Sequence, residues 1–168
     1  MVRGSVDRIR RASDNPAVIA RAFVILSLLL VGAGVNGAAA QPACTATRPD
    51  MLGPMYVAGA PERTQTGHGF VVTGTVRSVR DCVPLAGARI EWWSVNPRGE
   101  YDDAHRATQV VGPDGRYRYE TDMPVVYPGR PPHLHARVSA PGHRVLVTQL
   151  YPTAGQTAVE ADFVLVRE

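Results

Sequence analysis

The sequence predicts an all-β protein, an antiparallel β-sandwich of the prealbumin or immunoglobulin type that follows an N-terminal signal segment. Three observations predict this class. Short runs rich in β-branched and aromatic residues recur along the chain. Clusters of Gly, Pro and Asp separate these runs every ~8 to 12 residues, which is typical of sandwiches and barrels. No window of about ten residues after position 40 has a helical period.

Residues 1–40 have the pattern of a secretory signal. An arginine-rich start precedes the apolar run 23–31, and the small residues around Ala38 and Ala40 provide a cleavage point. The apolar run is shorter than the ~20 residues that cross a membrane, which disfavours an uncleaved anchor but leaves it open. We therefore expect an exported protein, periplasmic or extracellular, with no membrane attachment once the leader is cleaved.

Removal of the leader leaves residues 41–168, or 168 − 40 = 128 residues, the size of one domain. The leader holds five of the 18 basic and two of the 15 acidic residues, so 13 of each remain and the domain is nearly neutral. Without a basic patch, no nucleic-acid partner is expected. Cys44 and Cys82 are consistent with one disulfide in an oxidising compartment, and two free buried thiols are the alternative.

The first expected element of the domain is an extended arm over residues 41–66, where Pro and Gly are frequent. Strands are expected where β-branched and apolar residues concentrate. A Gly-Pro-Asp-Gly turn at 112–115 precedes an alternating run that is typical of a strand with one buried face. In chain order, the expected strands are 69–76, 88–93, 116–121, 133–138, 144–149 and 159–166.

The tripeptide His133-Leu134-His135 is the strongest functional signal. If it lies on a strand, its two imidazoles project from the same face, because successive side chains alternate. Tyr127 precedes it by six residues, and Tyr101 closes the run that begins at Asn96. Two tyrosines and two histidines together indicate a metal site with an uncommon set of donors.

Tyrosine selects for particular metals because its phenol must lose a proton, with an ordinary pKa near 10, before it binds strongly. A trivalent cation with a preference for oxygen can drive that ionisation. Two phenolates and two imidazoles therefore suit non-haem Fe(III) better than Zn(II) or Cu(II). Two phenolates and one hydroxide would also balance the charge of the ferric ion.

Further motifs extend this pattern along the chain. They are residues 53–56 (Gly-Pro-Met-Tyr), 84–88 (Pro-Leu-Ala-Gly-Ala), Trp93 with Asn96, Gly99 and Tyr101, residues 114–117 (Asp-Gly-Arg-Tyr), Pro124 with Tyr127, residues 130–135 (Arg-Pro-Pro-His-Leu-His) and Thr148-Gln149. In this order they resemble the intradiol ring-cleavage dioxygenases, the family of catechol 1,2-dioxygenase and protocatechuate 3,4-dioxygenase. The resemblance runs from about Cys44 to Pro152. The short connection from Tyr127 to His133 resembles a smaller, often secreted branch of that family.

The resemblance implies a ligand set for Fe(III). Tyr101 and His133 would stay bound throughout the reaction, and Tyr127 and His135 would lie along the axial direction. Tyr127 would leave the metal when the substrate binds and would take up one of its protons, so that it acts in turn as ligand and general base.

The resemblance also implies the substrates and two further site residues. The partners would be O2 and a catecholic small molecule, cleaved between its hydroxyls to a muconate-type diacid. Arg130 would stabilise negative charge on the activated ring. Gln149 would hydrogen-bond near the oxygen or the diol.

Several alternatives stay open at this point. The chain could be a catalytically inert, transthyretin-like sandwich that binds a partner; a cupin-like site is disfavoured because no glutamate follows the histidines at the expected spacing. Tyr56 could either overhang the pocket or pack inside the protein. A homo-oligomer is left open. The remaining histidines are expected at the surface or in loops; they are His68, His105 and His143.

Overall fold

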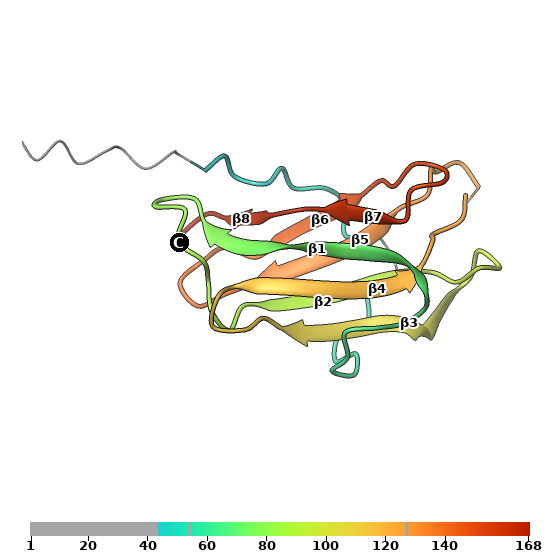
Figure 1. Cartoon of the computed structure of the whole chain (residues 1–168), viewed down its shortest axis with the longest axis horizontal. Helices are drawn as coiled ribbons and strands as arrows, with labels where there is room; N and C mark the ends of the chain where they lie inside the picture. Colours follow the sequence, from blue (N-terminus) through green and yellow to red (C-terminus); the bar gives the residue numbers. More distant parts are fainter. Residues whose placement is uncertain (1–43, 54, 127) are drawn as a thin grey trace, which may run out of the picture. The chain divides into compact units, whose positions relative to one another are not determined.

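The computed structural model describes residues 44–168 apart from positions 54 and 127, and these residues form two β-sheets (Figure 1). The predicted leader and its cleavage point lie outside the described residues. The first sheet has the order β4-β1-β7, with β8 also paired to β1; its strands are β1 (Gly69–Ser78), β4 (Arg116–Asp122), β7 (Ala158–Glu160) and β8 (Phe163–Leu165). The second has the order β3-β2-β5-β6; its strands are β2 (Arg89–Val95), β3 (Tyr101–Val110), β5 (Leu134–Ser139) and β6 (Leu146–Leu150).

The all-β prediction is confirmed, and its details need two corrections. The second sheet is antiparallel throughout, but β7 and β8 both run parallel to β1. The predicted strand 159–166 is divided because Asp162 interrupts it: its carboxylate accepts hydrogen bonds from the Thr75 backbone N–H at 2.7 Å and from Arg77 Nε at 2.9 Å. Within the described part of the chain, no helix is long and apolar enough to cross a membrane.

The strand β3 was not predicted from the sequence. It begins with Tyr101, Asp102 and Asp103, and five consecutive residues later in the strand are buried, 105–109. Such a run has neither the apolar content nor the alternation that identifies a strand with one exposed face. Its pairing with β2 fixes the position of Tyr101, which lies opposite Val95.

The core lies between the sheets and is built around aromatic rings. The Trp92 indole stacks on the Tyr119 ring, with centroids 4.8 Å apart and an interplanar angle of 4°. Phe163 stacks in turn on Tyr117, at 5.5 Å. Because these side chains come from both sheets and are almost fully buried, they hold the two layers together.

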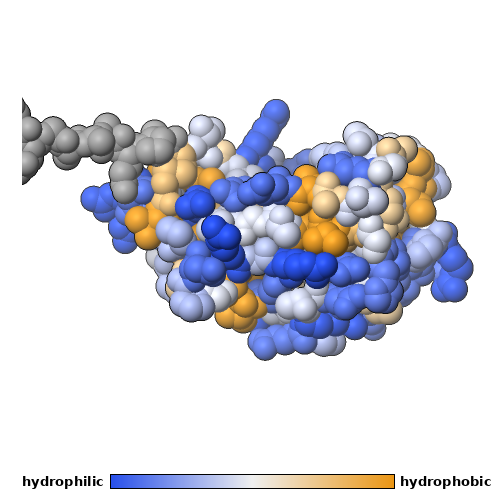
Figure 2. Space-filling model, viewed as in Figure 1, coloured by the Kyte–Doolittle hydropathy of each residue, from blue (hydrophilic) through white to orange (hydrophobic). Residues whose placement is uncertain are grey.

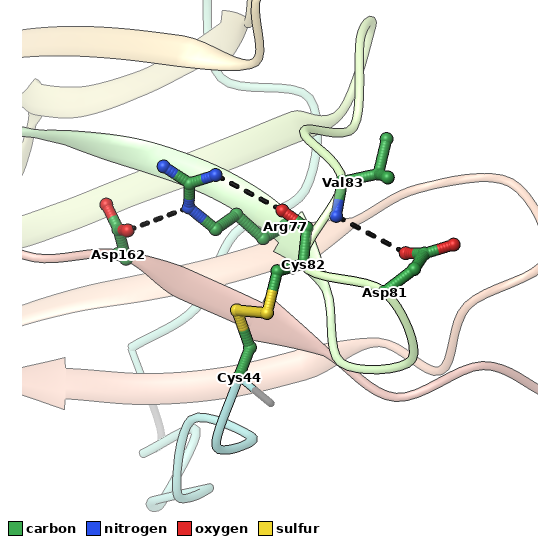
Figure 3. Close-up of a disulfide and its surroundings, with 6 residues drawn as sticks. All are labelled: Cys44, Arg77, Asp81, Cys82, Val83 and Asp162. Carbon is green, nitrogen blue, oxygen red and sulfur yellow. Dashed lines mark hydrogen bonds and ion pairs between the residues drawn. A yellow bond between two sulfur atoms is a disulfide. The ribbon is translucent and has the colours of Figure 1, made fainter. Parts of the chain in front are cut away.

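The predicted arm is present, and a disulfide attaches its start. Cys44 is bonded to Cys82, in the turn that follows β1 (Figure 3). From there the arm passes β8, where the Thr47 N–H donates to the Val164 carbonyl, and then β6, where the Asp50 N–H donates to the Val147 carbonyl. Its later part reaches β3, where the Arg63 N–H donates to the Thr108 carbonyl and the Thr108 N–H donates to the Pro61 carbonyl.

The arm therefore covers the outward side of the second sheet. Six consecutive residues of β2, 90–95, are buried as a result. The face that carries β4, β1 and β7 has a mainly hydrophilic surface with separate apolar patches (Figure 2). Because the arm covers the second sheet, a second buried layer forms between the arm and that sheet, separate from the main core.

Candidate metal centre

Three predicted ligands converge under the edge of the arm. The Tyr101 hydroxyl lies 3.3 Å from His133 Nε2 and 3.1 Å from His135 Nε2. Tyr101 is the first residue of β3, His133 directly precedes β5, and His135 is its second residue. The two imidazole rings lie 4.8 Å apart, centroid to centroid, at 75°. One oxygen and two nitrogen atoms are thus directed at a common position.

Local hydrogen bonding sets the tautomer of His133. Its Nδ1 lies 2.8 Å from the Pro131 carbonyl, which can only accept, so Nδ1 carries the proton. The Nε2 lone pair therefore points toward Tyr101. A backbone carbonyl behind an imidazole is the usual means by which proteins orient a histidine ligand.

His135 is held by packing. Its ring stacks on the Trp93 indole, with centroids 4.7 Å apart and an interplanar angle of 8°. Burial, together with the neighbouring His133 and the charge of Arg130, lowers the pKa of His135 to about 3. The imidazole is therefore neutral across the physiological range, and a neutral imidazole is the form that binds metal ions.

The arm leaves space beside His135 because it has a glycine there. Gly53 adopts a left-handed φ of 72°, and a Cβ added to it would lie 3.4 Å from His135 Cε1 and 4.0 Å from Nε2. A side chain at this position would occupy the space next to the coordinating nitrogen. The signal in the sequence was the motif at residues 53–56, although nothing in it indicates contact with His135.

The donor set fits Fe(III) by its chemistry. Among the described residues, no group of three or more His, Cys, Asp or Glu side chains is placed to hold a metal ion, and the third donor beside His133 and His135 is the phenol of Tyr101. A phenol with two neutral imidazoles suits a hard trivalent ion. Tyr127, the fourth predicted ligand, lies outside the described residues, and its role stays a prediction.

Arg130 and Gln149 lie together beside the histidines. Arg130 Nη2 donates to Gln149 Oε1 at 2.6 Å. Gln149 is on β6 directly opposite His135, so both side chains emerge on the covered face. Its amide nitrogen donates to the Met51 carbonyl of the arm at 2.7 Å, which occupies the group expected to contact oxygen or the diol. Their roles toward a substrate stay predictions.

Tyr56 is partly buried and has the packing role of the two alternatives. Its ring meets the Trp93 indole edge-on, with centroids 5.2 Å apart, and its hydroxyl donates to Glu91 at 3.0 Å. Glu91 is 5% exposed and also accepts a hydrogen bond from Arg137. This layer supports the stack of Trp93 on His135 from behind.

The other histidines were predicted at the surface or in loops, and this holds only in part. His68 is exposed, and His143 is in a loop but buried. His105 is buried on β3, where its two nitrogen atoms lie 2.8 Å from an Asp102 oxygen and 2.9 Å from an Asp122 oxygen. The prediction was wrong for His105 because the two carboxylates that allow an imidazole to be buried come from different strands.

Two site residues had no signal in the sequence. Tyr151 follows β6 and lies beside His133, with ring centroids 6.2 Å apart. Asp50, in the arm, accepts a hydrogen bond from the Tyr151 hydroxyl at 2.8 Å. Only the path of the arm brings these two residues together, across 101 positions of sequence.

The chain is similar in sequence and in structure to proteins named as dioxygenases. No family model matches the chain. A hydroxyquinol 1,2-dioxygenase of Rhizobium sp. (strain MTP-10005) is 34% identical, covering 63% of this chain and 48% of the relative. A catechol 1,2-dioxygenase of Acinetobacter baylyi is 31% identical, covering 70% and 50%. The solved dioxygenase domain of a dioxygenase and carbohydrate-binding fusion protein from the cellulolytic bacterium Streptomyces sp. SirexAA-E is 32% identical. It superposes with a TM-score of 0.67, covering 74% of this chain and 100% of the domain.

The chain belongs to the intradiol dioxygenase family. The chain spans about half the length of the curated relatives it matches. In this member of the family, the sandwich brings Tyr101, His133 and His135 together.

Proposed function

We propose that this domain holds a non-haem Fe(III) ion and cleaves an aromatic 1,2-diol between its hydroxyls, with both atoms of O2 entering a muconate-type diacid. One observation supports this most strongly: the phenol oxygen of Tyr101 lies within 3.3 Å of the two imidazole Nε2 atoms. Tyr101, His133 and His135 would hold the ion, with Tyr127 as the fourth ligand. The relatives named as hydroxyquinol and catechol 1,2-dioxygenases support the same reaction.

Bound Fe(III) would supply the Lewis acidity that ionises the phenols and the diol and makes the diolate ring reactive toward O2. The protein residues then manage protons and charge. Tyr127 would accept a proton from one diol hydroxyl as general base. Arg130 would place positive charge beside the anionic diolate, where an environment with little water strengthens the attraction.

The buried layer behind the site would exclude water and keep the ligands fixed. Trp93 stacks on one face of His135, and Tyr56 packs against Trp93. An orientation of the ligands that is set before metal and substrate bind lowers the cost of reaching the reactive geometry.

The decisive test uses purified protein reconstituted with Fe(III). Wild type is expected to show a visible phenolate-to-iron absorption band, to take up O2 and to form a diacid with at least one of catechol, protocatechuate, hydroxyquinol and methoxylated catechols. Tyr101→Phe is expected to lose the activity and the part of the band that Tyr101 contributes, so that at most a weaker band from Tyr127 remains. Tyr117→Phe is the matched control, because it removes a hydroxyl from β4 in the other sheet, where Tyr117 donates to the Ala161 carbonyl. Colourless wild-type protein without bound iron would favour the inert binding module.

We also propose that the protein acts outside the cytoplasm. The signal-like pattern of residues 1–40 and the disulfide between Cys44 and Cys82 support this, because disulfides persist in oxidising compartments. Mass spectrometry of the periplasmic and secreted fractions should detect a mature N-terminus near Gln41. Detection of the full-length chain in the cytoplasm alone would contradict export.

A further inference from the structure

The side chain of Tyr151 has several polar contacts next to the candidate metal centre. Its hydroxyl lies 2.8 Å from Asp50 Oδ2, 3.2 Å from Arg130 Nη2 and 2.9 Å from Gln149 Oε1. The residue is 45% exposed, and its ring lies beside that of His133. Together with the arm it lines a surface hollow of about 580 Å³. The hydroxyl is therefore accessible and belongs to a network of three segments: the arm, the loop before β5, and the end of β6.

The single proton of the Tyr151 hydroxyl decides which groups donate and which accept in this network. A phenol has one proton, and of its two acceptors the Asp50 carboxylate forms the stronger, charge-assisted bond. With that proton on the Asp50 side, a lone pair of the hydroxyl accepts from Arg130. Arg130 Nη2 thus donates to two oxygen atoms, those of Tyr151 and Gln149. The Arg130 guanidinium is therefore held by two neutral acceptors, and the Asp50 carboxylate contacts the Tyr151 hydroxyl that lies between them.

This arrangement leaves the positive charge of Arg130 available to the site. Among the residues that the structure describes, no carboxylate lies within ion-pair distance of Arg130. The charge of Arg130 acts on two neighbouring groups, because it contributes to lowering the pKa of Asp50 and that of His135. A direct ion pair would fix the guanidinium equally well but would cancel much of its charge.

We propose that Tyr151, anchored by Asp50, is a positioning residue that holds the Arg130 guanidinium beside the paired imidazoles. The inference rests on the proposed function, because the charge so placed would act on the anionic diolate. Without the hydroxyl, Arg130 keeps one acceptor, Gln149, and its long side chain can turn toward solvent. A misplacement of this kind lowers the rate without removing any group that touches the substrate.

The test is a double-mutant cycle on the iron-loaded enzyme with the diol that wild type cleaves fastest. Tyr151→Phe is expected to lower kcat/KM by about 10-fold, through kcat more than through KM, because the lost interaction concerns charge in the transition state. In an Arg130→Ala background, Tyr151→Phe is expected to have no further effect. Full additivity of the two changes, or wild-type kcat/KM in Tyr151→Phe, would overturn the proposal.

Three controls separate positioning from general damage. The phenolate-to-iron band of Tyr151→Phe should match wild type, because Tyr101 is untouched. Tyr117→Phe, which removes a hydroxyl from the other sheet, should keep wild-type kcat/KM. Asp50→Asn leaves an acceptor for the Tyr151 hydroxyl but removes its charge, so its smaller loss should also vanish in the Arg130→Ala background.

A crystal structure of each protein tests the inference without turnover. In wild type the Arg130 guanidinium should contact both Tyr151 and Gln149, and in Tyr151→Phe it should leave Gln149 or occupy several positions. An unchanged, ordered guanidinium in Tyr151→Phe would overturn the positioning role even if the enzyme is active. Wild-type protein with this geometry but no cleavage of any diol would instead refute the proposed function.

Discussion

Two strands of equal length show how differently the two sheets are used. In β4 of the first sheet, buried and partly or fully exposed residues alternate, with Tyr117 and Tyr119 in the core and Arg116 and Arg118 in solvent. In β2 of the second sheet, six consecutive residues are buried. The difference comes from the arm, which covers the outward face of β2 but leaves that of β4 in water. A strand that is buried on both faces does not show the alternation of buried and exposed residues that is seen in a strand with one face in water.

The cover also changes what polar residues on that face can do. Glu91, on the outward side of β2, is 5% exposed and is satisfied by Arg137 and Tyr56. In the same layer, His135 is kept neutral by burial. On the outward face of β4, by contrast, the side chains of Arg116 and Arg118 are exposed to water. The candidate metal centre therefore depends on an arm that contributes little apolar core of its own.

The strongest perturbation of this comparison is removal of the link that attaches the arm. Cys44 and Cys82 are 38 residues apart, and a cross-link of that span stabilises by ~4 kcal/mol in the chain-entropy account. We expect Cys44→Ser/Cys82→Ser to lower the free energy of unfolding by about that amount. The iron band should remain in the folded state, because the backbone bonds of Thr47 and Asp50 still seat the arm. Urea unfolding, monitored by fluorescence and by the visible band, measures both.

Chemical reduction of wild type provides the control for that variant. Reduced wild type should unfold at the same urea concentration as the double serine variant. If the variant instead loses the iron band before it unfolds, the arm is held by the disulfide and not by its hydrogen bonds to β6 and β8. That outcome would make the cover itself dependent on oxidation.

A smaller and more local perturbation adds one carbon atom to the arm. Gly53 and Gly59 both have left-handed backbones, with φ of 72° and 81°. Alanine at either position should cost ~1–2 kcal/mol of stability for the same steric reason. Only at Gly53 would the new Cβ meet a ligand, at 3.4 Å from His135 Cε1; at Gly59 nothing lies within 4 Å. We therefore expect a weaker affinity for iron in Gly53→Ala alone, measured by competition with a chelator.

This matched pair separates strain from contact. Equal loss of iron affinity in Gly53→Ala and Gly59→Ala would mean that the arm transmits backbone strain to the site. Unchanged affinity in both would mean that the space beside His135 is not needed for the ion. Either result would contradict the role assigned to Gly53.

The same comparison explains how much the sequence could predict. The run 116–121 was predicted almost as β4 is observed, because one face in water gives a clear alternation. The strand β3 was missed, since its middle is buried on both sides and its start is acidic. Asp162 divides the last predicted strand through contacts with β1, which no local pattern reveals.

For the site, proximity in sequence decided what could be predicted. His133 and His135 form a local motif, whereas Tyr101 is 32 residues from His133, so no local spacing connects it to the histidines. Asp50 and Tyr151 were missed because only the path of the arm unites them. Gln149 was assigned to the right region, but its amide hydrogen bond to Met51 depends on the same path.

The smallest expected effect concerns the link between the two sheets. His105, on β3, bonds Asp102 on its own strand and Asp122 at the end of β4. Burial opposes its protonation, but the hydrogen bonds to Asp122 and Asp102 outweigh burial and raise the pKa of His105 above 6.5. The folded state thus favours the protonated imidazole. The resulting stability is fully present below pH 6.5 and is lost as the pH rises through the raised pKa.

We therefore expect wild type to lose stability relative to His105→Gln as the pH rises above 6.5 and through the raised pKa of His105. Glutamine can still donate to one carboxylate but does not titrate, so the difference between the two proteins isolates His105. Urea unfolding at a series of pH values measures this difference. A difference that stays constant would mean that His105 has the same pKa in the folded and unfolded chain. A difference that grows in favour of wild type at high pH would mean that the folded state binds fewer protons than the unfolded chain, so that burial outweighs the two hydrogen bonds and lowers the pKa of His105.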